Sequence, residues 1–124
     1  MNVIETKNAP GAIGPYSQGY AFGDLVITSG QIPVDPATGT TPEGISAQAE
    51  QSCKNVGAIL EAAGSGFDKV VKTTCFLSDI NDFAAFNGVY AKYFPENPPA
   101  RSCVQVAALP LGAKVEVEVI AVRG

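Results

Sequence analysis

Residues 99–122 read PARSCVQVAALPLGAKVEVEVIAV, and the alternating runs inside this stretch decide how the chain folds. From 101 to 107, arginine, cysteine and glutamine at 101, 103 and 105 alternate with serine and valine at 102, 104 and 106. Alternation with a period of two residues is typical of a strand. From 114 to 122, valine alternates with glutamate over most of the run. Residues 109–112, Leu-Pro-Leu-Gly, have the composition of a turn. The stretch therefore predicts two strands and a connection.

The polar residues of these strands suggest a site if the strands are neighbours. An antiparallel pair across the turn places Cys103 opposite Glu116 and Arg101 opposite Glu118. One face of the sheet then carries a guanidinium, a thiol and two carboxylates. Spacing alone leaves two interpretations of this face open. It is either a functional site or a solvated face with an Arg-Glu pair that contributes about 0.2–1 kcal/mol to stability.

Length and composition describe one globular domain over residues 1–124. Hydrophobic residues make up 46% of the chain and charged residues 16%, which is typical of a soluble protein with a real core. The net charge of -4, without a cluster of basic residues, argues against nucleic acid as a partner. No apolar run approaches the roughly 18 residues that span a bilayer, and no basic segment precedes an apolar one at the N-terminus. We expect a cytoplasmic protein without a membrane partner.

The cysteines and the absence of histidine restrict the chemistry. Cys53, Cys75 and Cys103 are odd in number and widely spaced, which favours reduced thiols over a disulfide framework. Without histidine or a Cys-x-x-Cys pair, we expect no metal site and no histidine-activated nucleophile. No glycine-rich phosphate loop follows a predicted strand, so we expect no nucleotide cofactor.

The rest of the chain predicts an α+β fold in which two helices cover one face of a mixed sheet. The strands at 24–30 and 69–78 carry apolar side chains on both faces, so the uncovered face must meet a partner, and self-association is the simplest source. The predicted elements before residue 99 are an edge strand at 2–5, a hairpin of 18–22 and 24–32 turning at Gly23-Asp24, a helix from about 45 to 63, a strand at 69–78 and a helix from its cap Asn81 to Phe94.

Several single residues have both a structural and a functional interpretation. Tyr16 lies in a loop rich in glycine and proline, either as a packing aromatic or as a group presented to a ligand. Gly30 ends a strand, either at a bulge or where a ligand approaches the backbone. Cys53 and Cys75 fall in apolar patterns and are expected to pack in the core. Asn87 lies one residue beyond an aromatic stripe of the second helix.

The run from ARSCV through LP to VEVEVIAV resembles the C-terminal signature of the YjgF/Rid family of reactive intermediate deaminases, and the likeness covers essentially the whole chain. The resemblance implies a chorismate-mutase-like subunit and a homotrimer with clefts between neighbouring subunits. In that family a Gly-Pro-Tyr loop borders the active cleft, and residues 14–16 match it. Departures from the family pattern are Gln105, Ala108 and Leu111-Gly112, and none of these falls on an expected site position.

The resemblance implies cofactor-independent hydrolysis of 2-imino acids, such as 2-iminobutanoate and 2-iminopropanoate, to 2-oxo acids and ammonia. Arg101 is expected to bind the substrate carboxylate through its planar fork. Glu116 is expected to deprotonate the attacking water and pass the proton to the departing ammonia. The other expected substrate-binding residues are Tyr16, Gly30, Asn87 and Cys103. We expect Cys103 to act through its backbone, because no histidine activates the thiol.

Two other functions remain open at this point. A non-catalytic trimer that binds small carboxylates or partner proteins would keep Arg101 but would not need Glu116. An endoribonuclease or translation inhibitor, an activity sometimes attached to this family, is disfavoured by the acidic net charge and the missing histidines.

Overall fold

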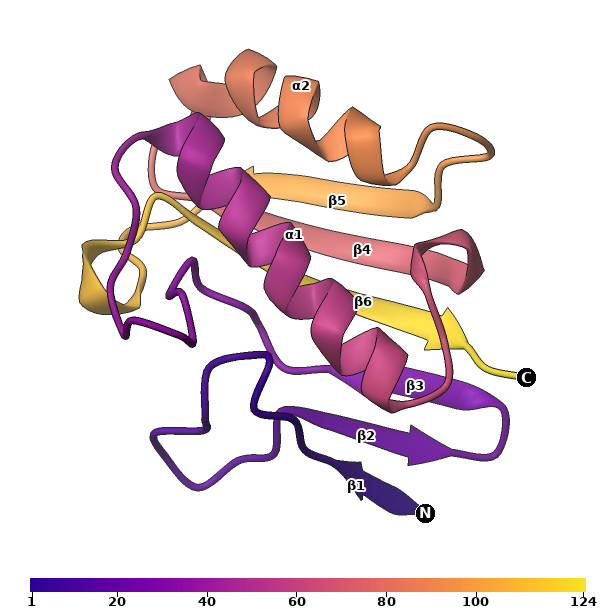
Figure 1. The fold of residues 1–124 in the computed structure, drawn as a ribbon. Helices are drawn as coiled ribbons and strands as arrows, with labels where there is room; N and C mark the ends of the chain where they lie inside the picture. The colour runs from indigo at the N-terminus through magenta and orange to yellow at the C-terminus, as the bar shows by residue number, and fades with distance from the viewer.

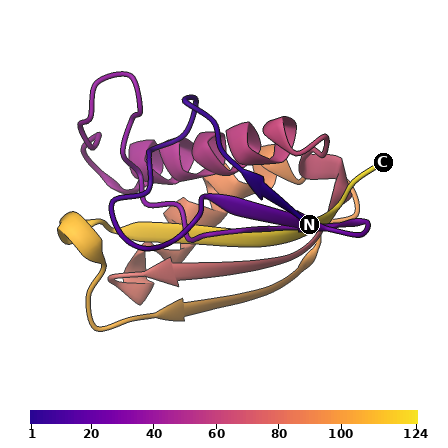
Figure 2. The same ribbon diagram turned by 90° about the horizontal axis from the view of Figure 1, so that it is seen from below.

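The computed structural model describes residues 1–124 and shows one six-stranded sheet with both helices on one of its faces (Figures 1 and 2). The predicted α+β arrangement is confirmed. The strands are β1 (Asn2–Ile4), β2 (Gly19–Phe22), β3 (Leu25–Thr28), β4 (Val70–Leu77), β5 (Ala100–Gln105) and β6 (Val115–Val122). The helices are α1 (Ile45–Ala62) and α2 (Phe83–Tyr93), and the short 3-10 turns are η1 (Phe67–Lys69), η2 (Ile80–Asp82) and η3 (Pro110–Gly112).

The sheet is mixed, with the strand order β1-β2-β3-β6-β4-β5. Every neighbouring pair is antiparallel except β4 and β5, which run parallel. The predicted hairpin is present as β2 and β3, and its turn uses Gly23 at a φ of 57°, a value that glycine adopts at little cost.

The predicted pairing of the two C-terminal strands is wrong, because β4 lies between them. Cys75 of β4 is aligned with Cys103 of β5 on one side and with Val117 of β6 on the other. Interior placement satisfies the backbone of β4 on both edges, while β5 is left at the edge of the sheet. The connection 106–114 is long enough to reach over one strand, since neighbouring strands lie about 4.8 Å apart. Local alternation could not reveal the inserted strand.

The helices begin and end where local signals place them, with one exception. α1 ends at Ala62, close to the predicted end at 63, and Gly64 follows at a φ of 76°, a left-handed conformation that commonly terminates helices. Asn81 does not cap the second helix, contrary to prediction: the Asp79 side chain accepts a hydrogen bond from the Asn81 backbone N–H at 2.9 Å and starts η2. α2 then begins only at Phe83.

The core lies between the helices and the sheet face they cover. Its fully buried members include Val26, Val56, Ile59, Leu60, Leu77, Phe86, Val115 and Val117. Cys53 and Cys75 are buried as predicted, and burial raises the pKa of both thiols to about 12. Both therefore remain protonated and act as packing groups.

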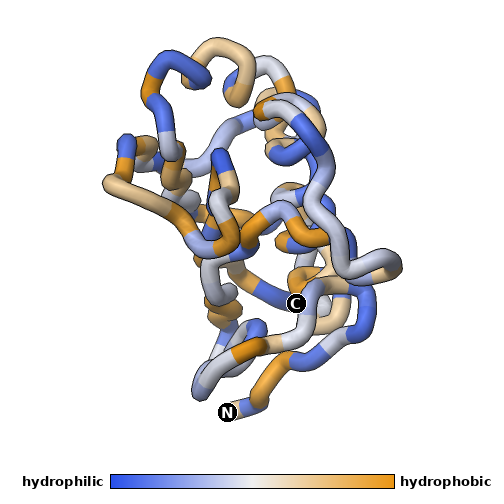
Figure 3. Tube along the Cα trace, turned by 90° about the vertical axis from the view of Figure 1, so that its left-hand side faces the viewer, coloured by the Kyte–Doolittle hydropathy of each residue, from blue (hydrophilic) through white to orange (hydrophobic).

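The opposite face of the sheet is apolar and uncovered in the subunit. Leu25 and Ile27 of β3 are exposed while Val26 between them is buried, so this strand is apolar on both faces as predicted. Exposed apolar side chains on the same face of the neighbouring strands include Val3, Phe22, Val104, Ile120 and Val122. Figure 3 shows hydrophilic and hydrophobic residues interspersed along the whole trace.

Neither helix is long and apolar enough to cross a membrane.

Candidate functional site

The predicted site residues form two groups on opposite faces of the sheet. Val115, Val117 and Val119 of β6 point toward the helices and are buried, so Glu116 and Glu118 project from the uncovered face. Arg101 and Cys103 are aligned with Thr73 and Cys75, whose side chains lie under the helices. The prediction that one face carries the guanidinium, the thiol and both carboxylates is therefore wrong, because β5 and β6 are not neighbours.

The first group orients the Arg101 guanidinium against α2. Arg101 Nη1 donates a hydrogen bond of 2.8 Å to Asn87 Oδ1. The guanidinium carbon lies 4.8 Å from the centroid of the Tyr90 ring and 5.4 Å from that of Phe83, within the range of cation–π attraction. The single ion pair of the structure joins Lys92 and Glu50, so no carboxylate neutralises Arg101. A held guanidinium with free N–H groups is suited to bind a carboxylate.

Cys103 lies on the same side as Arg101 and is half-buried. Burial raises the pKa of its thiol, and the nearby Arg101 guanidinium offsets part of that rise. The thiol therefore stays protonated near neutral pH, which is the form with little nucleophilic reactivity. This environment agrees with the expectation that Cys103 does not attack the substrate.

The second group brings Glu116 against Gly30. Gln31 exchanges backbone hydrogen bonds with Val117, of 2.8 and 3.2 Å, and this bridge places Gly30 beside β6. A Cβ atom on Gly30 would overlap the Glu116 carboxylate. Burial raises the pKa of Glu116, and the negative charge of Glu118 raises it further. A partly desolvated carboxylate is a stronger base than one in water, which suits proton transfer.

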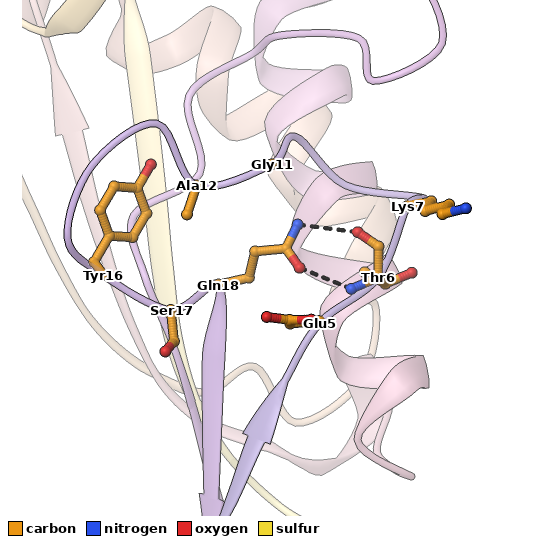
Figure 4. A pocket seen from close by; sticks show the side chains of 8 residues that line it. All are labelled: Glu5, Thr6, Lys7, Gly11, Ala12, Tyr16, Ser17 and Gln18. Atoms are coloured by element: carbon orange, nitrogen blue, oxygen red, sulfur yellow. Dashed lines mark hydrogen bonds between the residues drawn. The ribbon is translucent and has the colours of Figure 1, made fainter.

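Tyr16 borders the cavity to which Gly30 also contributes. The cavity has a volume of about 250 Å³, and its walls come from the 10–18 loop, the 30–34 segment and Leu111. Tyr16 is 50% exposed, and its hydroxyl accepts a long hydrogen bond of 3.4 Å from the Ile13 N–H. Figure 4 shows a second pocket, lined by residues 5–7, 11–12 and 16–18, so Tyr16 borders it as well. Gly30 thus lies next to the Glu116 carboxylate and also lines the cavity that Tyr16 borders.

Comparison with known proteins decides the family. A family model described as endoribonuclease L-PSP matches residues 6–123. The chain belongs to the YjgF/Rid family. The 2-iminobutanoate/2-iminopropanoate deaminase of Salmonella typhimurium is 58% identical to it over 123 residues, which cover 97% of this chain and 96% of the relative. The Escherichia coli protein of the same name is 56% identical, with the same coverage.

Solved structures of relatives have the same fold as this YjgF/Rid subunit. The E. coli TdcF structure with bound serine has a TM-score of 0.97 and 51% sequence identity, and the match covers 100% of both chains. The structure of the E. coli YjgF gene product has a TM-score of 0.96 and 54% identity, again over 100% of both chains. The predicted family is confirmed, as is the YjgF-type fold of the subunit.

A single YjgF/Rid subunit does not bring Arg101 and Glu116 to the same ligand, since the two side chains leave opposite faces of the sheet. No sequence pattern indicates that Gly30 packs on Glu116, because the contact depends on the backbone pairing of Gln31 with Val117, which lies beyond the end of β3. Nor does any pattern single out Gln31, whose backbone makes that pairing and whose side chain is buried.

We predict that Gly30→Ala lowers kcat/KM for imine hydrolysis by about 10- to 100-fold, because a methyl group at this position displaces the Glu116 carboxylate. Steady-state kinetics, together with a thermal melt, measures both effects. Gly88→Ala is the matched control, because a Cβ atom at Gly88 meets nothing within 4 Å. Equal rates for Gly30→Ala and the wild type would show that the position of Glu116 does not matter.

Proposed function

We propose that this protein is a hydrolytic deaminase that converts reactive 2-imino acids, such as 2-iminobutanoate and 2-iminopropanoate, to 2-oxo acids and ammonia. The observation that carries the proposal is the close likeness, over nearly the whole chain, to relatives with that name. The site supports it, because the chain holds an unpaired guanidinium for a carboxylate and a carboxylate with a raised pKa.

The proposed assembly is a homotrimer of chorismate-mutase-like subunits with a cleft between each pair of neighbours. Two features support it: the apolar face of the sheet that the helices leave uncovered, and the separation of the two residue groups on opposite faces. Each cleft would take Arg101, Asn87 and Cys103 from one subunit and Tyr16, Gly30 and Glu116 from the next. A site built in this way is complete only in the oligomer.

The chemistry then follows from these groups. Arg101 binds the substrate carboxylate through two N–H groups, which fixes the C=N carbon in the cleft. Glu116 takes a proton from water while the oxygen attacks that carbon and the electron pair moves to nitrogen. Glu116 returns this proton to nitrogen, which gives a carbinolamine. Glu116 then transfers the hydroxyl proton of the carbinolamine to the same nitrogen, the C–N bond breaks, and ammonia leaves as the C=O bond of the 2-oxo acid forms. The overall reaction converts one imino acid and one water to one 2-oxo acid and one ammonia.

No cofactor takes part in this proposal, since the carbon of an imine is electrophilic enough for water. We place the reaction in the cytoplasm, where pyridoxal-phosphate dehydratases release such imines. The three cysteines are unpaired, which fits a reducing compartment.

The other functions considered from sequence are not favoured. A binding module for small carboxylates has no need of a carboxylate with a raised pKa beside Gly30. RNA cleavage is not favoured, because a net charge of -4 opposes the binding of nucleic acid and the chain contains no histidine.

The test of the proposed function is the release of ammonia and 2-oxobutanoate from 2-iminobutanoate, generated in situ by a threonine dehydratase. We expect the wild-type protein to accelerate both above the spontaneous rate. A folded oligomer that leaves the spontaneous rate unchanged, with imines of several side-chain sizes, would favour the binding module instead.

A further inference from the structure

The loop between β1 and β2 has almost no backbone hydrogen bonds of its own. Between residues 5 and 18, the only backbone–backbone bond that joins two loop residues runs from the Tyr16 N–H to the Gly14 carbonyl, at 2.8 Å. The loop contains two prolines and two glycines, and glycine adds conformational freedom. Other contacts must therefore fix the position of Tyr16.

Gln18 supplies most of these contacts. Its side-chain oxygen Oε1 accepts a hydrogen bond of 2.7 Å from the Thr6 N–H, and Nε2 lies 3.0 Å from the Thr6 carbonyl, as Figure 4 shows. Nε2 is also within hydrogen-bonding distance of the Ala9 and Pro10 carbonyls, at 3.2 and 2.7 Å. One amide thus ties the start and the middle of the loop to the entry of β2.

The Gln18 side chain has no N–H donor left for a ligand. A glutamine amide has two N–H donors, and Nε2 lies within hydrogen-bonding distance of three loop carbonyls, while Oε1 accepts from the Thr6 N–H. Gln18 is 5% exposed although it borders the cavity that Tyr16 and Gly30 line. Its role in this region is therefore to hold the protein backbone and not to bind substrate.

We propose that Gln18 is a positioning residue for imine hydrolysis, because it holds the 6–17 loop in the shape that places Tyr16 beside Gly30 at the cavity. The Ser29 hydroxyl donates to the Ser17 carbonyl at 2.5 Å and anchors the same end of the loop to the end of β3. The proposal rests on the proposed function, in which Tyr16 contacts the substrate.

The test compares Gln18→Met with Gln48→Met, each of which keeps side-chain length but removes the amide. Gln48 is a matched control: it is 6% exposed, donates to the Pro42 carbonyl at 3.0 Å and accepts from the Lys114 N–H at 2.8 Å, and neither partner belongs to the 6–17 loop. We expect both variants to melt at a lower temperature. Only Gln18→Met should raise KM, by about tenfold, with kcat changed less than about twofold. An equal change in KM in both variants, or none in Gln18→Met, would overturn the proposal.

A double-mutant cycle asks whether Gln18 acts through Tyr16. In a Tyr16→Ala background, Gln18→Met should change KM by less than about twofold, because the group being positioned is gone. A full additional tenfold increase would assign Gln18 a separate role. If Gln18→Met does not fold, Gln18→Glu gives the same comparison, since it keeps the acceptor for Thr6 and sets a carboxylate against three carbonyls.

A readout without catalysis separates this inference from the proposed function. Lys7 is exposed in the same loop, so trypsin should cleave after Lys7 faster in Gln18→Met than in the wild type or Gln48→Met. Wild-type protein that fails to hydrolyse imines contradicts the proposed function. Cleavage and KM unchanged in Gln18→Met contradict the role of Gln18 alone.

Discussion

Glu116→Gln is expected to lower kcat for imine hydrolysis by about 100- to 10,000-fold while the affinity for the 2-oxo acid product changes little. Glutamine keeps the size and the packing against Gly30 but cannot accept the proton from water. The rate is measured as ammonia release, and the affinity for 2-oxobutanoate by calorimetry. Lost turnover with retained binding is the signature of a group that acts on the transition state.

Glu118→Gln is the matched control, because Glu118 lies two residues away on the same strand and the same face. We expect its kcat to stay within a few-fold of wild type. If Glu116→Gln turned over substrate at the wild-type rate, the water would have to be activated by another group, and the proposed base would be wrong.

The pH dependence of the wild-type enzyme should report the same carboxylate. Glu116 acts as a base only when ionised, so kcat/KM falls as the pH drops through its pKa. Since burial and then Glu118 raise that pKa above 4.5, the acidic limb should lie above pH 4.5. In Glu116→Gln the acidic limb should disappear from the residual rate. A limb at or below pH 4.5 would contradict the desolvated state of Glu116.

Arg101→Lys is expected to raise KM by about 100-fold, although the positive charge remains. Lysine offers no planar fork for two carboxylate oxygens, and it loses the fixed orientation that Asn87, Tyr90 and Phe83 give the guanidinium. Initial rates over a range of substrate concentrations measure the effect. The loss should also appear directly as weaker binding of 2-oxobutanoate.

The other arginine of the chain provides the control. Arg123 donates from Nε to the Gly23 carbonyl at 3.2 Å and lies at the far end of β6 from Glu116. Arg123→Lys should leave KM within about twofold of wild type. A wild-type KM for Arg101→Lys would mean that the substrate carboxylate is bound elsewhere.

The sequence by itself determined the local structure and much of the chemistry that is available. Strand alternation with a period of two residues, the helix predicted from about 45 to 63 and the turn at Gly23 rest on local signals, and the observed elements follow them. The same patterns predicted the buried Cys53 and Cys75 and the apolar uncovered face. These features depend on neighbours along the chain, which a sequence displays directly.

Only the tertiary structure decided which strands meet and therefore which functional groups share a face. Alternation determines that the Glu116 side chain lies on the opposite face of the sheet from Val115, Val117 and Val119. It does not determine which strand lies beside β6. β4, from another part of the chain, occupies the place between β5 and β6 because its backbone and apolar side chains are satisfied on both sides there. The contact of Glu116 with Gly30 arises in the same way, from long-range packing that no local pattern encodes.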